Sequence, residues 1–124
     1  MRARHPNCCW TGATFFWLRI AADLMDPAAA AEALDGVAEL AVEMHAPRRA
    51  ATLLGAAARL RDEVGLALFV VEARDHKRVT AAARAAFGDA AFDQAWREGR
   101  AMGLEGAMRY ALKVRVRLTG RPQV

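Results

Sequence analysis

The chain has 124 residues, enough for one domain with a single modest core. Hydrophobic residues make up 55% of it, but 30 of the 124 are alanine, so the composition favours an all-α fold of closely spaced helices and disfavours a bulky or β-rich core. No apolar run reaches the ~18 residues of a membrane span, and the absence of serine excludes a serine nucleophile.

The N-terminal region differs in character from the alanine-rich middle of the chain. Residues 1–14 are expected to form a disordered tail, and a helix is predicted over 15–25. Within it Phe16, Ile20 and Leu24 recur at helical spacing, and we expect this row to pack on the next helices.

Two further features of the N-terminal region bear on where the protein resides. A secretion signal is the less favoured alternative, with 8–18 as its apolar stretch, because Arg19 interrupts it. Cys8 and Cys9 are adjacent and no second pair exists, a spacing typical of neither a metal site nor a disulfide framework. The simplest expectation is a reduced cytoplasmic protein without a membrane contact.

Residues 27–65 predict two helices that fold back on each other at His45-Ala46-Pro47. Asp26-Pro27 is typical of a helix start, Pro47 prevents the first helix from continuing, and Gly65 is a common C-cap. A short turn forces the two helices to be antiparallel neighbours. The predicted contact faces are Leu34, Val37, Ala41 and Met44 on the first helix, and Ala50, Leu53, Leu54, Ala57, Leu60 and Val64 on the second.

Three more helices are predicted after an apolar linker over 66–71. The first covers 72–87, the second follows Gly88-Asp89, and the third begins at Leu104 and ends near 112. Residues 113–124 are expected to form an unstructured basic tail. The residues of helix 72–87 predicted to face inward are Val79, Ala82, Ala83 and Ala86.

The positive charge lies at the two ends of the chain. Residues 20–108 hold 10 Lys/Arg against 14 Asp/Glu, whereas 1–19 hold three Arg and 109–124 hold five Lys/Arg, both without an acid. Basic ends are usually solvated, and they can also contact nucleic acid weakly and without reading sequence. The candidates for such contacts are Lys113, Arg115, Arg117 and Arg121.

No constellation for chemistry is present in the sequence. His5, His45 and His76 lack metal-ligand spacing and no nucleophile accompanies them, and no glycine-rich phosphate loop occurs. An acidic stripe could bind a cation or a basic partner, although such stripes are more often solvated. We therefore predict no enzyme, catalytic residue, cofactor or metal. The stripe consists of Glu32, Asp35, Glu39 and Glu43.

Large apolar side chains suggest an interaction surface. A cluster of rings and methionines can form a partner groove, although at helical spacing it is more often core. The candidates are Phe15, Phe16, Trp17, Phe92, Trp96, Met102 and Met108. The three adjacent rings at 15–17 point in different directions around a helix, so we expect self-association through residues 10–25.

The predicted hairpin resembles one tetratricopeptide repeat. Laid on the 34-residue pattern from Ala31, the small positions match at Ala38, Ala50 and Ala57, and the large apolar positions match at Leu34, Val37 and Leu54. Ala41 stands where an aromatic residue is usual, and Asp62 where a proline is usual. One such unit cannot bury its own faces, so flanking helices must cover it.

A second resemblance covers residues 27–112. The run AAFDQAWREGRAM over 90–102, with AATLLGAA over 50–57 and AARAAFG over 82–88, resembles the C-terminal end of large bacterial LuxR-type transcriptional regulators. These are multidomain ATPases with tetratricopeptide-like arrays. Gly103 and Gly106 depart from the pattern, where the family tends to have serine and glutamate. The ATPase and helix-turn-helix modules lie outside the resemblance, so none of their functional residues carries over.

Together these observations predict an all-α protein of tetratricopeptide-like antiparallel hairpins, the end of a short α-solenoid, with its helical domain over 15–112. Its expected function is a non-enzymatic, protein-interaction module that resembles the signal-receiving end of a transcriptional regulator. The expected partners are a second copy or preceding helical repeats. The alternatives are a nucleic-acid accessory protein that uses basic tails, or a truncated remnant without a separate function.

Overall fold

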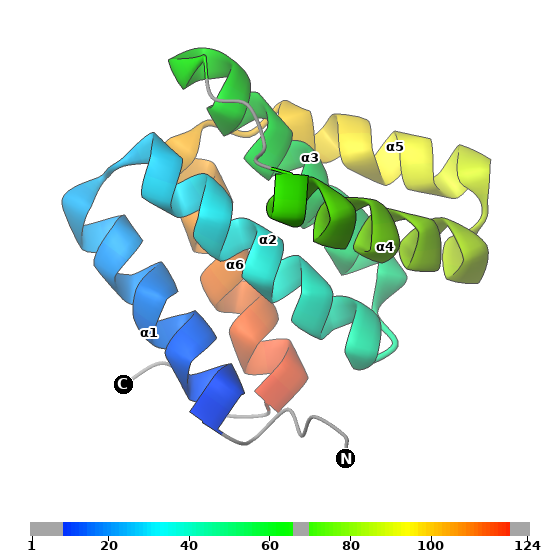
Figure 1. The fold of residues 1–124 in the computed structure, drawn as a ribbon, viewed down its shortest axis with the longest axis horizontal. Coiled ribbons are helices and arrows are strands. Elements are labelled where there is room, and N and C mark those ends of the chain that lie inside the picture. Colours follow the sequence, from blue (N-terminus) through cyan, green and yellow to red (C-terminus); the bar gives the residue numbers. More distant parts are fainter. Residues whose placement is uncertain (1–8, 66–69, 120–124) are drawn as a thin grey trace.

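The computed structural model describes the backbone of residues 9–65 and 70–119, and side chains at positions 16, 18–65, 74 and 76–113. Within these ranges it contains six helices and no strand, which confirms the all-α class. Helix α3 contacts α2, α4, α5 and α6, and Figure 1 shows α1 on the other side of α2. Their bounds are α1 Cys9–Leu24, α2 Pro27–Glu43, α3 Pro47–Val64, α4 Val70–Phe87, α5 Asp89–Arg100 and α6 Leu104–Thr119.

Local signals produce the α2–α3 hairpin where the sequence predicts it. The Asp26 carboxylate accepts a hydrogen bond from the Ala28 amide at 3.1 Å, and prolines occupy the first positions of both helices. His45 adopts a left-handed φ of 61°, which reverses the chain between the helices. Gly65 ends α3 in the left-handed region, a conformation that glycine adopts without steric cost.

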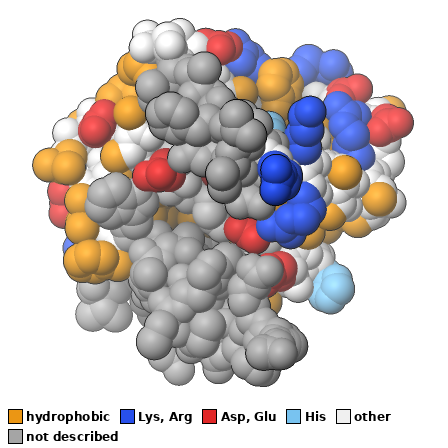
Figure 2. All heavy atoms as spheres, in the orientation of Figure 1, with side chains coloured by type: hydrophobic (Ala, Val, Ile, Leu, Met, Phe, Trp, Pro, Cys, Tyr) orange, Lys and Arg blue, Asp and Glu red, His pale blue; other side chains and the backbone are white. Residues whose placement is uncertain are grey.

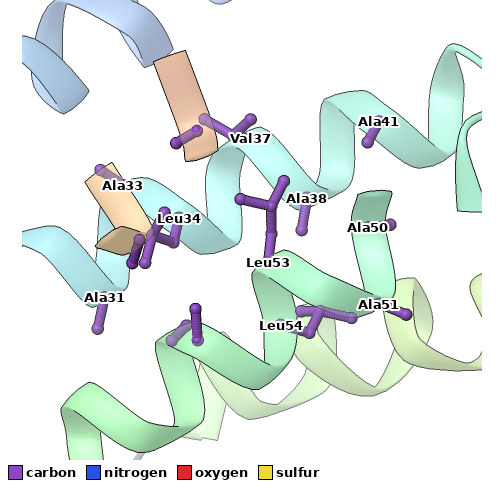
Figure 3. Packing of buried hydrophobic residues seen from close by; sticks show 14 of the residues in the cluster. Ala31, Ala33, Leu34, Val37, Ala38, Ala41, Ala50, Ala51, Leu53 and Leu54 are labelled. Atoms are coloured by element: carbon purple, nitrogen blue, oxygen red, sulfur yellow. The ribbon is translucent and has the colours of Figure 1, made fainter. Parts of the chain in front are cut away.

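Helix α3 is buried on more than the one face that its periodicity predicts. Every residue from Ala50 to Ala57 is buried, because α2 packs on one side of α3 and α5 on another. Figure 3 shows Leu53 directed at α2 beside Ala38, where the small alanine leaves room for it. Val64 is the exception to the predicted face, since it lies exposed in the last turn of α3.

The backbones of α3 and α5 touch at two glycines. A Cβ atom on Gly55 would lie 2.0 Å from the carbonyl oxygen of Trp96, and one on Gly99 would lie 1.9 Å from that of Thr52. The spacing of apolar residues in the two helices does not predict that either glycine lies at a helix contact. Glycine inside a helix costs about 1 kcal/mol relative to alanine, so two of them on facing helices indicate a close approach.

Helix α6, the last helix of the chain, packs against helices from the N-terminal half of the protein. It packs against α1, α2 and α3, and Figure 1 shows it crossing behind α2. Ala107, Met108 and Ala111 are its buried residues. The core is therefore continuous from α1 to α6 and consists mostly of alanine and leucine.

Several predicted boundaries differ from the structure. Helix α1 begins at Cys9, where a tail was expected up to residue 14, and α4 begins at Val70, within the expected linker. Helix α6 continues to Thr119 instead of ending near 112, because 107–119 contain neither glycine nor proline and the cations there favour a helix C-terminus. Residues 1–8, 66–69 and 120–124 lie outside the described residues, and the predictions for them stay untested.

The predicted inner face of α4 is half correct. Val79 and Ala83 are buried, as expected, whereas Ala82 and Ala86 are exposed. Val79 and Ala83 are one turn apart, so α4 contacts its neighbours through a narrow stripe. Ala82 and Ala86 lie along one edge of the same helix face, and the neighbouring helices leave that edge exposed.

Candidate interaction surface

Helix α1 packs on α2 through a face opposite to the one predicted. Leu18 and Ala21 are fully buried and Ala22 is partly buried against the core. These residues follow the i, i+3, i+4 spacing of one helix face. The two alanines allow α1 to approach α2 closely, which a face containing Phe16 would prevent.

Large apolar side chains therefore cover the outside of α1. Phe16 is 67% exposed, Leu24 66% and Met25, in the turn after the helix, 51%, while Ile20 between them is half-buried. We call these four residues the α1 outer surface. In Figure 2 hydrophobic side chains gather along the left margin, over α1. The side chains of Phe15 and Trp17, also predicted to be interacting residues, lie outside the described set.

The predicted patch of rings and methionines near the C-terminus is core. Phe92 and Met108 are only 2% and 4% exposed, so they are unavailable to a partner. Trp96 and Met102 are partly buried against the same core. The Arg100 guanidinium lies 5.4 Å from the ring centre of Trp96, and Arg84 lies 4.3 Å from that of Phe92. The groove interpretation is therefore wrong for Phe92 and Met108.

The acidic stripe on α2 connects neighbouring helices. Asp35 forms a partly buried ion pair with Arg61 of α3, and Glu39 accepts a hydrogen bond from Arg78 of α4 at 3.0 Å. Arg48, at the start of α3, pairs instead with Glu98 of α5 at 3.2 Å. In the described part of the chain no group of acids, cysteines or histidines is arranged to hold a metal ion.

His76 is a histidine whose surroundings change its proton affinity. It lies half-buried on α4, and burial, followed by the positive charge of Arg61, lowers its pKa below the usual 6.5. Charging this imidazole would place a second cation beside Arg61 in a partly desolvated site. Protonation of His76 is therefore coupled to the stability of the fold. No metal ligand set accompanies this histidine among the described residues.

The predicted nucleic-acid contacts lie on α6 or beyond it. Lys113 is exposed, and the helix carries Arg115 and Arg117 in its last turns. The side chains of Arg115 and Arg117 lie outside the described set. Arg121 is outside the described residues. A cationic helix end also stabilises the helix dipole, which is the ordinary structural reason for such residues.

The run from Ala95 to Arg100, which carries the family resemblance, forms the contact between α5 and α3. Gly99 provides the close backbone approach, Glu98 pairs with Arg48, and Arg100 pairs with Asp62 at 2.8 Å. The Arg59 side chain also donates to the Arg100 carbonyl oxygen at 3.2 Å. The motif is therefore explained by packing, without a ligand.

Comparison with known proteins finds transcription regulators. The chain is 36% identical over 84 residues to proteins from two strains of Mycobacterium tuberculosis and from Mycobacterium bovis, each named "Putative HTH-type transcriptional regulator". The match covers 68% of this chain and 10% of each relative's length. The chain is thus similar to a small part of these regulators. No family profile and no solved structure matches it, and none of its described helices is long and apolar enough to cross a membrane.

Proposed function

We propose that this chain is a non-enzymatic interaction module of a transcriptional regulator, and that the α1 outer surface is its protein contact. The observation that carries the proposal is the distribution of exposed apolar side chains. Among the described residues four large hydrophobic side chains are exposed, and three of them belong to the α1 outer surface. Exposed apolar area concentrated on one element typically marks a contact with another protein.

The tetratricopeptide-like part of the proposal is supported by the α2–α3 hairpin. Ala38, Ala50 and Ala57, the small positions of the repeat pattern, are all fully buried. Helix α6 packs against α1, α2 and α3 and so covers part of this array, as a capping helix does. The α1 outer surface has no such cover among the described residues. The expected partners are therefore a second copy of the chain or a preceding helical segment of a longer regulator.

The regulatory part of the proposal rests on the mycobacterial relatives. Because this chain spans a tenth of their length, the activity of those regulators as whole proteins is not assigned to it. Its proposed role is to relay a contact to the rest of a regulator. The C-terminal tetratricopeptide-like region of LuxR-type regulators is the architecture that the residues of α3 and α5 resemble.

The test compares two charge substitutions on opposite sides of the molecule. Phe16→Glu places a carboxylate at the N-terminal end of the α1 outer surface, whereas Ala85→Glu places one on the exposed side of α4, away from α1. Both positions are exposed, so both variants should keep the wild-type helical circular-dichroism spectrum. Binding is measured in two arms, as self-association by sedimentation, and as co-elution with the remainder of the M. tuberculosis relative.

We expect binding in at least one arm, lost with Phe16→Glu and kept with Ala85→Glu. If neither arm shows binding by the wild-type chain, or if Phe16→Glu binds as well as wild type, the α1 outer surface is not a protein contact.

A further inference from the structure

We infer that the α1 outer surface joins two copies of this chain as an antiparallel helix pair related by a two-fold axis. This inference rests on the function proposed above and specifies the partner. Its basis is the pattern of charge that accompanies the exposed apolar row. Arg19 and Asp23 are both exposed, and they lie four residues apart on the outer side of α1.

The two charges lie along one edge of the apolar row. At 100° per residue, Phe16, Ile20 and Leu24 fall within an 80° arc of the helix, and Asp23 and then Arg19 continue this arc on the Phe16 side. The row and its charged edge are therefore parallel lines along the helix. A partner helix that covers the row must also meet the charged edge.

Arg19 and Asp23 are not used elsewhere in the described structure. The ion pairs of the described residues connect α2, α3, α4 and α5 and leave both of these side chains without a partner. A pair within α1 would have arginine on the N-terminal side, which is the less favourable order for an i, i+4 pair. Both charges are thus available to a second chain.

An antiparallel second copy satisfies the apolar row and the charges together. Pairing about a point near residues 20 and 21 sets Phe16 opposite the partner's Leu24, Ile20 opposite its equivalent, and Arg19 opposite the partner's Asp23. The centres of the apolar row and of the charged edge differ by one residue, so an axis at Ile20 leaves Arg19 and the partner's Asp23 offset by two residues, or about 3 Å along the helix, which a long arginine side chain spans. The two-fold axis repeats the ion pair, so each dimer contains two.

A parallel pair would not be complementary. Its two-fold axis would run along the helices and place the two charged edges on opposite sides of the contact, so neither Arg19 nor Asp23 would meet an opposite charge of the partner. The charge pattern therefore selects the antiparallel orientation. A contact of one helix from each copy is smaller than the ~1,200 Å² of a standard stable interface, and we expect dissociation in the micromolar range.

The test is a charge swap followed by sedimentation equilibrium of the full chain in reducing buffer. Arg19→Asp should weaken the dimer about tenfold, since it removes two ion pairs and opposes two pairs of carboxylates. Asp23→Arg should weaken it similarly by opposing arginines. The double variant Arg19→Asp/Asp23→Arg restores complementarity with the charges exchanged, and it should return to the wild-type dissociation constant. Arg74→Asp, at an exposed position on α4, is the matched control for net charge and should leave the constant unchanged.

The possible outcomes separate this inference from the function proposed above. Rescue by the double variant supports the antiparallel dimer, whereas single variants without effect, or a double variant no better than the singles, overturn it. If the wild-type chain stays monomeric but binds the remainder of the mycobacterial relative, the dimer is overturned and the interaction function stands. If it binds neither, both fail.

Discussion

Replacing Gly55 by alanine is the sharpest test of how α3 and α5 pack. The new Cβ would lie 2.0 Å from the Trp96 carbonyl oxygen, whereas ordinary contact begins at 3.4 Å, so the two backbones must separate locally by about 1.4 Å. The obstructing atoms belong to the backbone, and a change of side-chain rotamer cannot relieve the contact. Separation also loosens the packing of Phe92 and Ala95, which are buried residues of α5.

The expected cost is the balance of two opposing effects. Overpacking of this severity costs about 3 kcal/mol, and the higher helix propensity of alanine returns about 1 kcal/mol. The free energy of unfolding should therefore fall by about 2 kcal/mol. Urea titration followed by circular dichroism at 222 nm measures this difference if the transition is two-state.

Two further variants make the test specific. Gly106→Ala is the matched control, because its Cβ would meet only the Met102 side chain at an ordinary 3.8 Å, and helix propensity alone should stabilise the protein by up to about 1 kcal/mol. Gly99→Ala should be as harmful as Gly55→Ala, and the double variant should cost less than the sum, since one separation relieves both contacts. A Gly55→Ala protein as stable as wild type would refute the close crossing of α3 and α5.

Three other perturbations test separate parts of the structure. Leu54 is almost fully buried, so Leu54→Ala should lower the free energy of unfolding by about 2–5 kcal/mol in the same urea assay, and a cost within error would contradict the position of α3 at the centre of the core. The folded-state pKa of His76 lies below its unfolded value of 6.5, so the unfolded chain takes up this proton first as the pH falls, and the His76 contribution to stability should be fully present above pH 6.5 and be lost progressively on acidification. His76→Gln should reduce the dependence of the free energy of unfolding on pH in urea titrations from pH 7.5 to 5.5, and an unchanged dependence would contradict the assignment. Binding to fluorescent DNA duplexes, measured by anisotropy, should be weak and equal for unrelated sequences, and it should be lost between about 50 and 200 mM salt. Lys113→Glu should weaken this binding, and a preference for one sequence would contradict a purely electrostatic contact.

Local chemistry in the sequence determined where most helices begin and end. Asp26-Pro27, Pro47 and Gly65 act through their own backbone and side-chain geometry, which needs no distant neighbour, so the bounds of α2 and α3 were predicted correctly. The abundance of alanine indicated the helical class in the same way. The turn at Gly88 and the helix after it have equally local causes.

Which face of a helix is buried was decided by tertiary structure. Helix α1 carries an apolar row at Phe16, Ile20 and Leu24 and a second, smaller row at Leu18 and Ala21, and periodicity alone favours the larger side chains. The structure buries the smaller row, because small residues allow α1 to approach α2 closely. The candidate interaction surface is a consequence of this choice.

The role of α3 also depended on contacts that periodicity does not contain. Its apolar spacing indicates one buried face, whereas α5 covers a second face through Gly55 and Gly99. The sequence shows which positions are glycine, but only the opposing backbone in the folded structure explains why a side chain is excluded there. Composition and local geometry thus determined a helical protein with its turns in place, and the distances between helices decided which residues form its core and which remain available to a partner.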